Sequence, residues 1–175
     1  MRLRRSSFGR ERPATIGPVL TVRRSAARDI ECCVAIVREL PDYFTEDVPA
    51  KVESDLSAHS GWVAVETERV VGFAVVDRRS PGAAEILWIA VADAERGQGV
   101  GSVLLDRLIT ELADEGVQLI EVKTLDESAN YQPYAVTNAF YERHGFIQID
   151  TIDPLPGWPP GNPAAIYVAA LSPSR

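Results

Sequence analysis

The stretch Ala84-Glu-Ile-Leu-Trp-Ile-Ala-Val-Ala-Asp-Ala-Glu-Arg-Gly-Gln-Gly-Val-Gly-Ser102 determines how the rest of the chain is interpreted. An apolar, strand-like run over residues 86–92 ends in a polar turn, which leads into Arg96-Gly-Gln-Gly-Val-Gly101 and a helical pattern. A strand, a glycine-rich turn and a helix start together place free backbone N–H groups at the positive end of a helix dipole. Such a turn is suited to bind a phosphate or a pyrophosphate.

Length and composition indicate one globular domain. The chain has 175 residues, of which 46% are hydrophobic and 25% charged, as in an ordinary soluble protein. No run approaches the roughly 18 apolar residues of a membrane helix, so we expect no membrane association. We expect residues 18–172 to form the single domain and residues 1–17 to be a disordered basic leader, with a targeting remnant as the alternative.

Charge and cysteine content exclude several classes of partner. The net charge is −7 although residues 1–12 carry five arginines against one glutamate, so the remainder is strongly acidic. Nucleic-acid binding needs clustered Lys and Arg, so we expect no nucleic-acid partner. Cys32 and Cys33 are adjacent and lack metal-ligand spacing, which predicts neither a disulfide framework nor a metal site. We expect a reduced, cytoplasmic protein.

Hydrophobic periodicity predicts the order of the elements. Asp29 and Pro49 are typical helix-start residues for the first two helices, and Pro41 and Gly116 follow predicted helix ends. Strands are expected over residues 19–23, 61–65, 70–76, 85–92, 117–124, 146–149 and 166–171, and helices over 30–40, 49–58, 100–115 and 134–143. Short turns join the second, third and fourth strands, which predicts an antiparallel meander. The fifth strand follows a helix and should lie parallel to the fourth.

Three ligand classes compete for the glycine-rich turn. A Walker phosphate loop requires Gly-Lys, which occurs nowhere in the chain. A dinucleotide site is closer, because Gly97-x-Gly99-x-Gly101 is present and Glu121 lies about 20 residues past the turn, where the ribose-binding acid is expected. Yet Ser102 stands at the third glycine site, the turn follows a meander, and only one strand–helix–strand unit is present. The dinucleotide site therefore ranks third among the three ligand classes.

Two motifs resemble those of the GNAT superfamily of N-acetyltransferases. Arg96-x-x-Gly99-x-Gly101 is similar to the acetyl-CoA motif that holds the cofactor pyrophosphate. About 40 residues later, Ala139-Phe-Tyr-Glu-Arg-His-Gly-Phe146 is similar to the family's Phe-Tyr-x-x-x-Gly-Phe ending. The resemblance covers nearly all of the chain beyond the leader. It implies a GNAT-like α+β fold, with a mixed, mostly antiparallel six- to seven-stranded sheet and about four helices on its two faces.

The resemblance also implies the roles of individual residues. Acetyl-CoA would be the cosubstrate, with no metal required. Its pantetheine arm would pair with the strand backbone, Arg96 would add charge, and backbone N–H groups of the turn would hold the pyrophosphate. The cofactor-binding residues implied are Ile89, Ala90, Val91, Arg96, Gly97, Gln98, Gly99, Val100, Gly101 and Ser102.

Two residues are candidates for proton transfer. The resemblance implies that Tyr141 is the general acid for the leaving thiolate, and its ordinary pKa near 10 is close enough to that of a thiol. The alternative interpretation is that Tyr141 is an aromatic residue of the hydrophobic core without a catalytic role. Glu85 matches a Glu that some members use as the base, or it is a strand-end carboxylate in water or in an ion pair. Many members have an Asn seven residues before the Tyr; this chain has Tyr134 there, and Asn138 is out of register.

Two loops could shape the acceptor site. Residues 42–47 mix acidic and aromatic side chains, which would suit a cationic amine, although a solvated loop with two anchoring aromatics is the favoured interpretation. Residues 153–163, which include Trp158 and five prolines, could roof the acceptor site or form a subunit contact.

The resemblance therefore implies an acyltransferase that moves the acetyl group of acetyl-CoA to a primary amine. Attack would be direct, through a tetrahedral intermediate, because both cysteines lie on the first predicted helix. The alternative is a non-catalytic acyl-CoA-binding sensor, which would need the glycine-rich turn but neither Tyr141 nor Glu85. The acceptor, a small-molecule or peptide amine, is left open, as are a longer acyl group and a homodimer.

Overall fold

The computed structural model describes residues 19–172 and contains one seven-stranded sheet, four α-helices and three short 3₁₀ helices. The helices are α1 (Ile30–Arg38), α2 (Val48–Ala58), α3 (Val100–Asp114) and α4 (Pro133–Arg143), with η1 (Ala27–Asp29), η2 (Asp93–Glu95) and η3 (Glu127–Ala129). The strands are β1 (Leu20–Arg24), β2 (Ser60–Glu66), β3 (Arg69–Ser80), β4 (Ala83–Val91), β5 (Leu119–Leu125), β6 (Ile147–Ile152) and β7 (Ala164–Ala170). The expected leader at residues 1–17 lies outside the described residues.

The sheet has the strand order β1-β2-β3-β4-β5-β7-β6. Its neighbouring strands are antiparallel except for β4 and β5, which are parallel. This arrangement confirms the predicted mixed, mostly antiparallel sheet, including the meander and the parallel pair. No helix within residues 19–172 is long and apolar enough to span a membrane.

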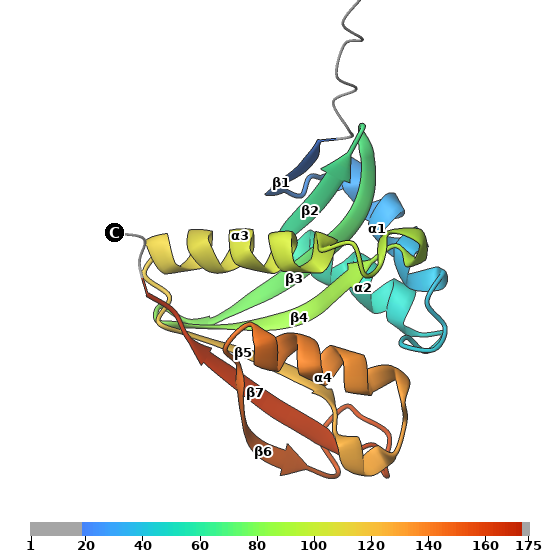
Figure 1. Cartoon of the computed structure of the whole chain (residues 1–175), viewed down its shortest axis with the longest axis vertical. Coiled ribbons are helices and arrows are strands. Elements are labelled where there is room, and N and C mark those ends of the chain that lie inside the picture. The colour runs from blue at the N-terminus through green and yellow to red at the C-terminus, as the bar shows by residue number, and fades with distance from the viewer. Residues whose placement is uncertain (1–18, 173–175) are drawn as a thin grey trace, which may run out of the picture.

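Helices cover both faces of the sheet, α1 and α2 on one and α3 and α4 on the other (Figure 1). The alternation of side chains along β3 assigns them to the two layers. Phe73 and Val75 belong to the core under α1 and α2, whereas Ala74 and Val76 belong to the core under α3. Both cores are therefore built on the central strands, which gives β4 a rigid support on its β3 side.

The boundaries differ from the expected ones where polar residues continue an element. β3 extends through residues 77–80, beyond the predicted 70–76, because its polar end still pairs with the start of β4.

Asp29 stands at the start of α1 as expected, but its carboxylate makes no capping bond to that helix. It accepts hydrogen bonds from Arg23 at 2.7 and 2.8 Å and from the Ala26 N–H at 2.8 Å, which keeps the pKa of Asp29 below its usual value.

A β-bulge in β4 positions the functional site. Val76 lies opposite Ile86 and Val75 lies opposite Trp88, so Leu87 is the extra residue. Bulges bend a strand and re-aim its side chains, and here the pairing of β4 with β5 ends at Ile86 and Val122. Beyond that point the two strands diverge (Figure 1). The β5-facing edge of residues 87–91 is thereby freed from sheet pairing.

Candidate functional site

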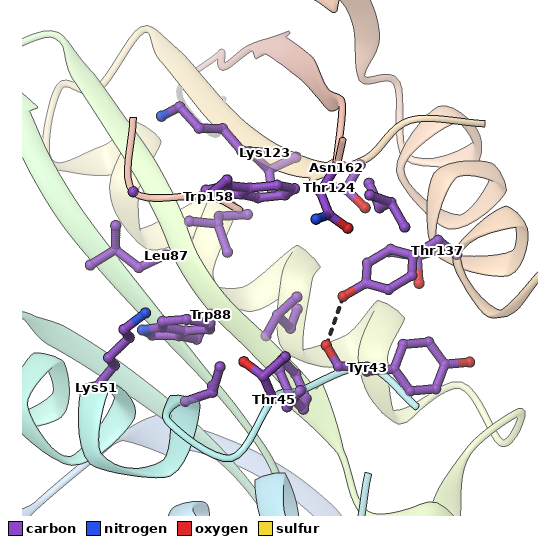
Figure 2. A pocket seen from close by; sticks show the side chains of 18 of the residues that line it. Tyr43, Thr45, Lys51, Leu87, Trp88, Lys123, Thr124, Thr137, Trp158 and Asn162 are labelled. Carbon is purple, nitrogen blue, oxygen red and sulfur yellow. Dashed lines mark hydrogen bonds between the residues drawn. The ribbon is translucent and has the colours of Figure 1, made fainter. Parts of the chain in front are cut away.

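A cavity of about 1030 Å³ lies where β4 and β5 diverge. Its walls come from residues 85–89 of β4, residues 122–125 of β5 and the inner side of α4. Residues 41–48, between α1 and α2, and residues 157–162, between β6 and β7, also line it. Both loops singled out in the sequence therefore lie at this cavity, and Trp158 is one of its lining side chains (Figure 2).

The glycine-rich turn joins η2 to α3 next to the end of β4. Gly97 and Gly99 have φ values of 74° and 86°, a left-handed conformation that glycine adopts without strain. Gly99 is the N-cap of α3, and within the described chain no side chain caps that helix. A Cβ at Gly97 or Gly99 would meet nothing within 4 Å. Open space beside uncapped N–H groups fits the expected pyrophosphate.

Ile89, Ala90 and Val91 lie on the part of β4 that has left β5. On their other edge they pair with Ala74, Phe73 and Gly72 of β3. Since β5 pairing has ended at Ile86, an extended ligand such as a pantetheine arm could add to this free edge as a strand would. The divergence of the strands therefore fits the ligand that the resemblance implies.

The Arg96 side chain contacts the loop between α1 and α2. Its guanidinium donates a 2.6 Å hydrogen bond to the Tyr43 hydroxyl and lies 4.3 Å from the centre of the Tyr43 ring. A weaker contact of 3.9 Å joins it to Asp93. The predicted phosphate-binding charge is thus held against the loop between α1 and α2, a contact between residues 53 positions apart that the motif alone does not reveal.

Tyr134, which stands where the family often has Asn, ties α4 to the same loop. Its hydroxyl donates a 2.7 Å hydrogen bond to the Tyr43 carbonyl (Figure 2), and the two rings lie 5.6 Å apart. Burial raises the pKa of Tyr134 to about 12, so the hydroxyl keeps its proton and remains a donor. Asn138 instead donates to the Leu125 carbonyl at 3.1 Å and anchors α4 to the end of β5.

Tyr141 lies on α4 and lines the cavity, with only 2% of its surface exposed. Its ring packs edge-on against Phe140 and Phe146, with centroids 5.4 and 5.3 Å away. Burial raises the pKa of Tyr141 above its usual value, and Tyr134 adds to the rise. The hydroxyl is therefore protonated at neutral pH, but it is a weaker acid than the ordinary value used for the sequence prediction suggests.

Glu85 lines the same cavity and is 6% exposed. Its carboxylate accepts hydrogen bonds from Arg79, with Nε at 2.8 Å, and contacts the Lys123 ammonium at 2.7 Å. Burial opposes the charge on Lys123, but its bonds to Glu121 and Glu85 prevail and raise the pKa of Lys123. Of the two sequence-based interpretations, the ion pair is present, and it holds Glu85 in a cavity shared with Tyr141.

Several residues that line the cavity were not predicted from the sequence to have a functional role. Trp88 sits on the face re-aimed by the bulge, and its indole N–H donates to Asp55 on α2 at 2.6 Å. Lys123 was part of a predicted strand only. These residues join the site through contacts between distant segments, which periodicity does not encode.

The cysteines lie elsewhere. Both are on α1, Cys32 exposed and Cys33 buried, and neither lines the cavity. Burial raises the pKa of Cys33 to about 12, which leaves its thiol protonated and unreactive. Within residues 19–172 no group of three or more His, Cys, Asp or Glu side chains is arranged to hold a metal ion.

Solved structures share this fold. A GNAT-family protein from Desulfovibrio desulfuricans matches with a TM-score of 0.76 and 21% identity, over 87% of this chain and 99% of that one. The ribosomal-protein-S18-alanine N-acetyltransferase of Escherichia coli matches with a TM-score of 0.72 and 20% identity, over 90% and 97%. A GNAT acetyltransferase from Elizabethkingia anophelis with acetyl-CoA bound matches with a TM-score of 0.65 and 18% identity, over 87% of this chain and 98% of that one.

Comparison of the sequence with models of protein families identifies the family of this chain. No curated protein sequence matches this chain. The family model described as an acetyltransferase (GNAT) domain matches residues 57–148, just over half of the 175 residues and the region that carries both motifs. Together with the seven-stranded fold, this match shows that the chain belongs to the GNAT superfamily of acetyltransferases.

Proposed function

We propose that this protein transfers the acetyl group of acetyl-CoA to a primary amine. The observation that carries the proposal is the divergence of β4 from β5. It provides a free strand edge leading to the uncapped start of α3 and a cavity that holds both Tyr141 and Glu85. The bound acetyl-CoA in the structural neighbour from Elizabethkingia anophelis supports the choice of donor.

Each end of the cofactor has a suitable partner. Backbone N–H groups at residues 97–102 would hold the pyrophosphate, and residues 89–91 would pair with the pantetheine arm. Acetyl-CoA supplies the acetyl group as a thioester. The amine attacks the thioester carbonyl and forms the new C–N bond. The C–S bond then breaks as the tetrahedral intermediate collapses, and the Tyr141 hydroxyl donates its proton to the departing thiolate. The same burial that raises the pKa of Tyr141 also disfavours a charged thiolate, which keeps this transfer feasible.

The amine must lose a proton before or as it attacks, and Glu85 is the proposed acceptor. A carboxylate has about four lone-pair sites. The two bonds from Arg79 and the one from Lys123 leave one of them for the amine or for a bridging water.

Thiol release and acetyl-CoA binding, measured side by side, test the proposal. Tyr141→Phe should lower kcat about 10²–10⁴-fold, the range for loss of a general acid, with little change in the Kd for acetyl-CoA. Tyr167→Phe is the matched control, because Tyr167 is equally buried, bonds to Glu142 at 3.2 Å and does not line the cavity. Equal rates in both variants would remove Tyr141 as the acid.

The sensor alternative has its own signature. Tight binding of acetyl-CoA without thiol release for small-molecule amines, amino acids or peptides would contradict transfer and favour a binding module. Absence of binding would contradict both functions.

A further inference from the structure

Aromatic side chains are concentrated around the candidate cavity. The chain has three Trp, five Tyr and five Phe, and seven of these thirteen line this one cavity. Tyr141 is proposed to act on the thiol, and Tyr43 and Tyr134 are bonded to each other. The two cavity tryptophans, Trp88 and Trp158, also line the cavity, and among residues 19–172 the only aromatic contact of either ring is that of Trp88 with Phe44.

Trp88 forms a fixed platform on one side. The bulge at Leu87 turns it toward α2, where its indole N–H is held by Asp55 at 2.6 Å. Phe44 braces the ring edge-on, with centroids 6.2 Å apart and planes at 66°. Because the platform is half-buried and held by three segments, little rotamer freedom is lost when a ligand packs on it.

Trp158 faces the cavity from the loop between β6 and β7. Its backbone N–H donates to the Leu155 carbonyl at 2.9 Å, and the loop is closed by a 3.2 Å hydrogen bond from the Gly161 backbone N–H to the Asp153 carboxylate. Figure 2 shows Trp158 and Trp88 on opposite sides of the pocket, with Leu87 beside them. The two rings, from segments 70 residues apart, therefore border one apolar space.

Polar groups complete the lining. Four carboxylates and two ammonium groups border the cavity: Asp42, Asp47, Asp55, Glu85, Lys51 and Lys123. Lys51 pairs with Asp47 and Lys123 with Glu85, so Asp42 and Asp55 are the lining carboxylates outside any ion pair among residues 19–172, and their charge favours a cationic ligand. Thr124 is 3% exposed, and its hydroxyl has no hydrogen-bond partner among residues 19–172. A buried hydroxyl of this kind needs a hydrogen-bond partner, which a polar group of a ligand or a bound water would supply.

We propose that the acceptor is a small aromatic amine whose ring inserts between Trp88 and Trp158 while its amine reaches toward Glu85. This inference rests on the proposed function and specifies its acceptor. The volume of about 1030 Å³ is that of a small-molecule site. A flat ring stacks on tryptophan, and its ammonium gains from the carboxylates and from the faces of the aromatic rings.

A matched pair of amines separates aromatic recognition from simple hydrophobicity. 2-Phenylethylamine and 2-cyclohexylethylamine have the same carbon skeleton, but only the first has a flat ring. We expect 2-phenylethylamine to bind about tenfold more tightly in a calorimetric titration without acetyl-CoA. Trp158→Leu should abolish the preference, whereas Trp158→Phe should retain part of it. Equal affinities, or a preference unchanged in Trp158→Leu, would overturn the inference.

The titration is independent of turnover, so its failure can be told apart from failure of the proposed function. Acetyl transfer to other amines without an aromatic preference would reject the aromatic acceptor and leave the transferase function standing. Binding of 2-phenylethylamine with the predicted Trp158 dependence, but without thiol release from acetyl-CoA, would support the aromatic site and reject the transfer.

Discussion

Substitution of Gly99 by Ala separates the two consequences of the glycine-rich turn, its backbone strain and its ligand binding. Gly99 has a φ of 86° at the start of α3, and a Cβ there meets nothing within 4 Å. Gly116, just past the end of the same helix, has a φ of 88° and equally open surroundings. Gly116→Ala is therefore a control with the same backbone strain at the opposite end of α3.

Both variants should lose the same stability. A non-glycine residue in the left-handed region costs about 1–2 kcal/mol, which for a protein of this size lowers Tm by roughly 2–8 °C. Only Gly99→Ala should weaken acetyl-CoA binding, because its methyl group occupies the open space beside the uncapped N–H groups. Loss of one hydrogen bond to a charged group is worth ~1.5–3 kcal/mol, or roughly a 10- to 100-fold rise in Kd.

Thermal unfolding and isothermal titration with acetyl-CoA measure the two effects separately. This role of Gly99 in cofactor binding is refuted if Gly99→Ala and Gly116→Ala bind acetyl-CoA equally well. It is also refuted if the two variants lose affinity in proportion to their loss of stability, because binding would then depend on the general integrity of α3.

Three other changes have defined outcomes. Glu85→Gln should lower kcat/KM about 100-fold or more if the carboxylate accepts the amine proton, whereas Glu121→Gln, which shares Lys123 outside the cavity, should not. The Ser128 hydroxyl is the main cause that lowers the pKa of Asp126 to about 2. The Asp126 carboxylate should therefore stabilise the fold above about pH 4 and lose that contribution as the pH falls toward about 2. In urea unfolding, the free energies of unfolding of Asp126→Asn and of the wild type should differ at neutral pH and become equal at the acidic end. Leu108→Ala, at a fully buried position on the inner face of α3, should lower the free energy of unfolding by about 2–5 kcal/mol, and a loss below ~1 kcal/mol would contradict its core position.

Local patterns predicted much of the fold. The glycine-rich turn, the meander and the parallel β4–β5 pair follow from periodicity and turn residues, because those signals act over a few neighbours. The run of apolar residues predicted only the buried part of β3. The polar residues at its end also pair with β4, but they add no hydrophobic pattern from which a strand could be predicted. Boundaries were therefore less well predicted than the elements.

The site was predictable only where a motif carried it. Tyr141 lies in the cavity as the second motif suggests. The partners of Glu85, the stacking of Arg96 on Tyr43 and the facing tryptophans depend on segments brought together by the fold. The raised pKa of Tyr141 likewise depends on burial. Non-local contacts of this kind have no periodicity or spacing in the sequence. The homodimer stays a prediction.

The fate of the acetyl group tests the central claim most directly. The protein would be incubated with acetyl-CoA labelled in the acetyl carbon and a set of primary amines that includes 2-phenylethylamine, and the label would be located by mass spectrometry while free thiol is counted. We predict that the label appears as an amide on an amine, in equal amount to the thiol released, with none on the protein. Label that remains in tightly bound acetyl-CoA, or that accumulates on a cysteine, would contradict direct acetyl transfer.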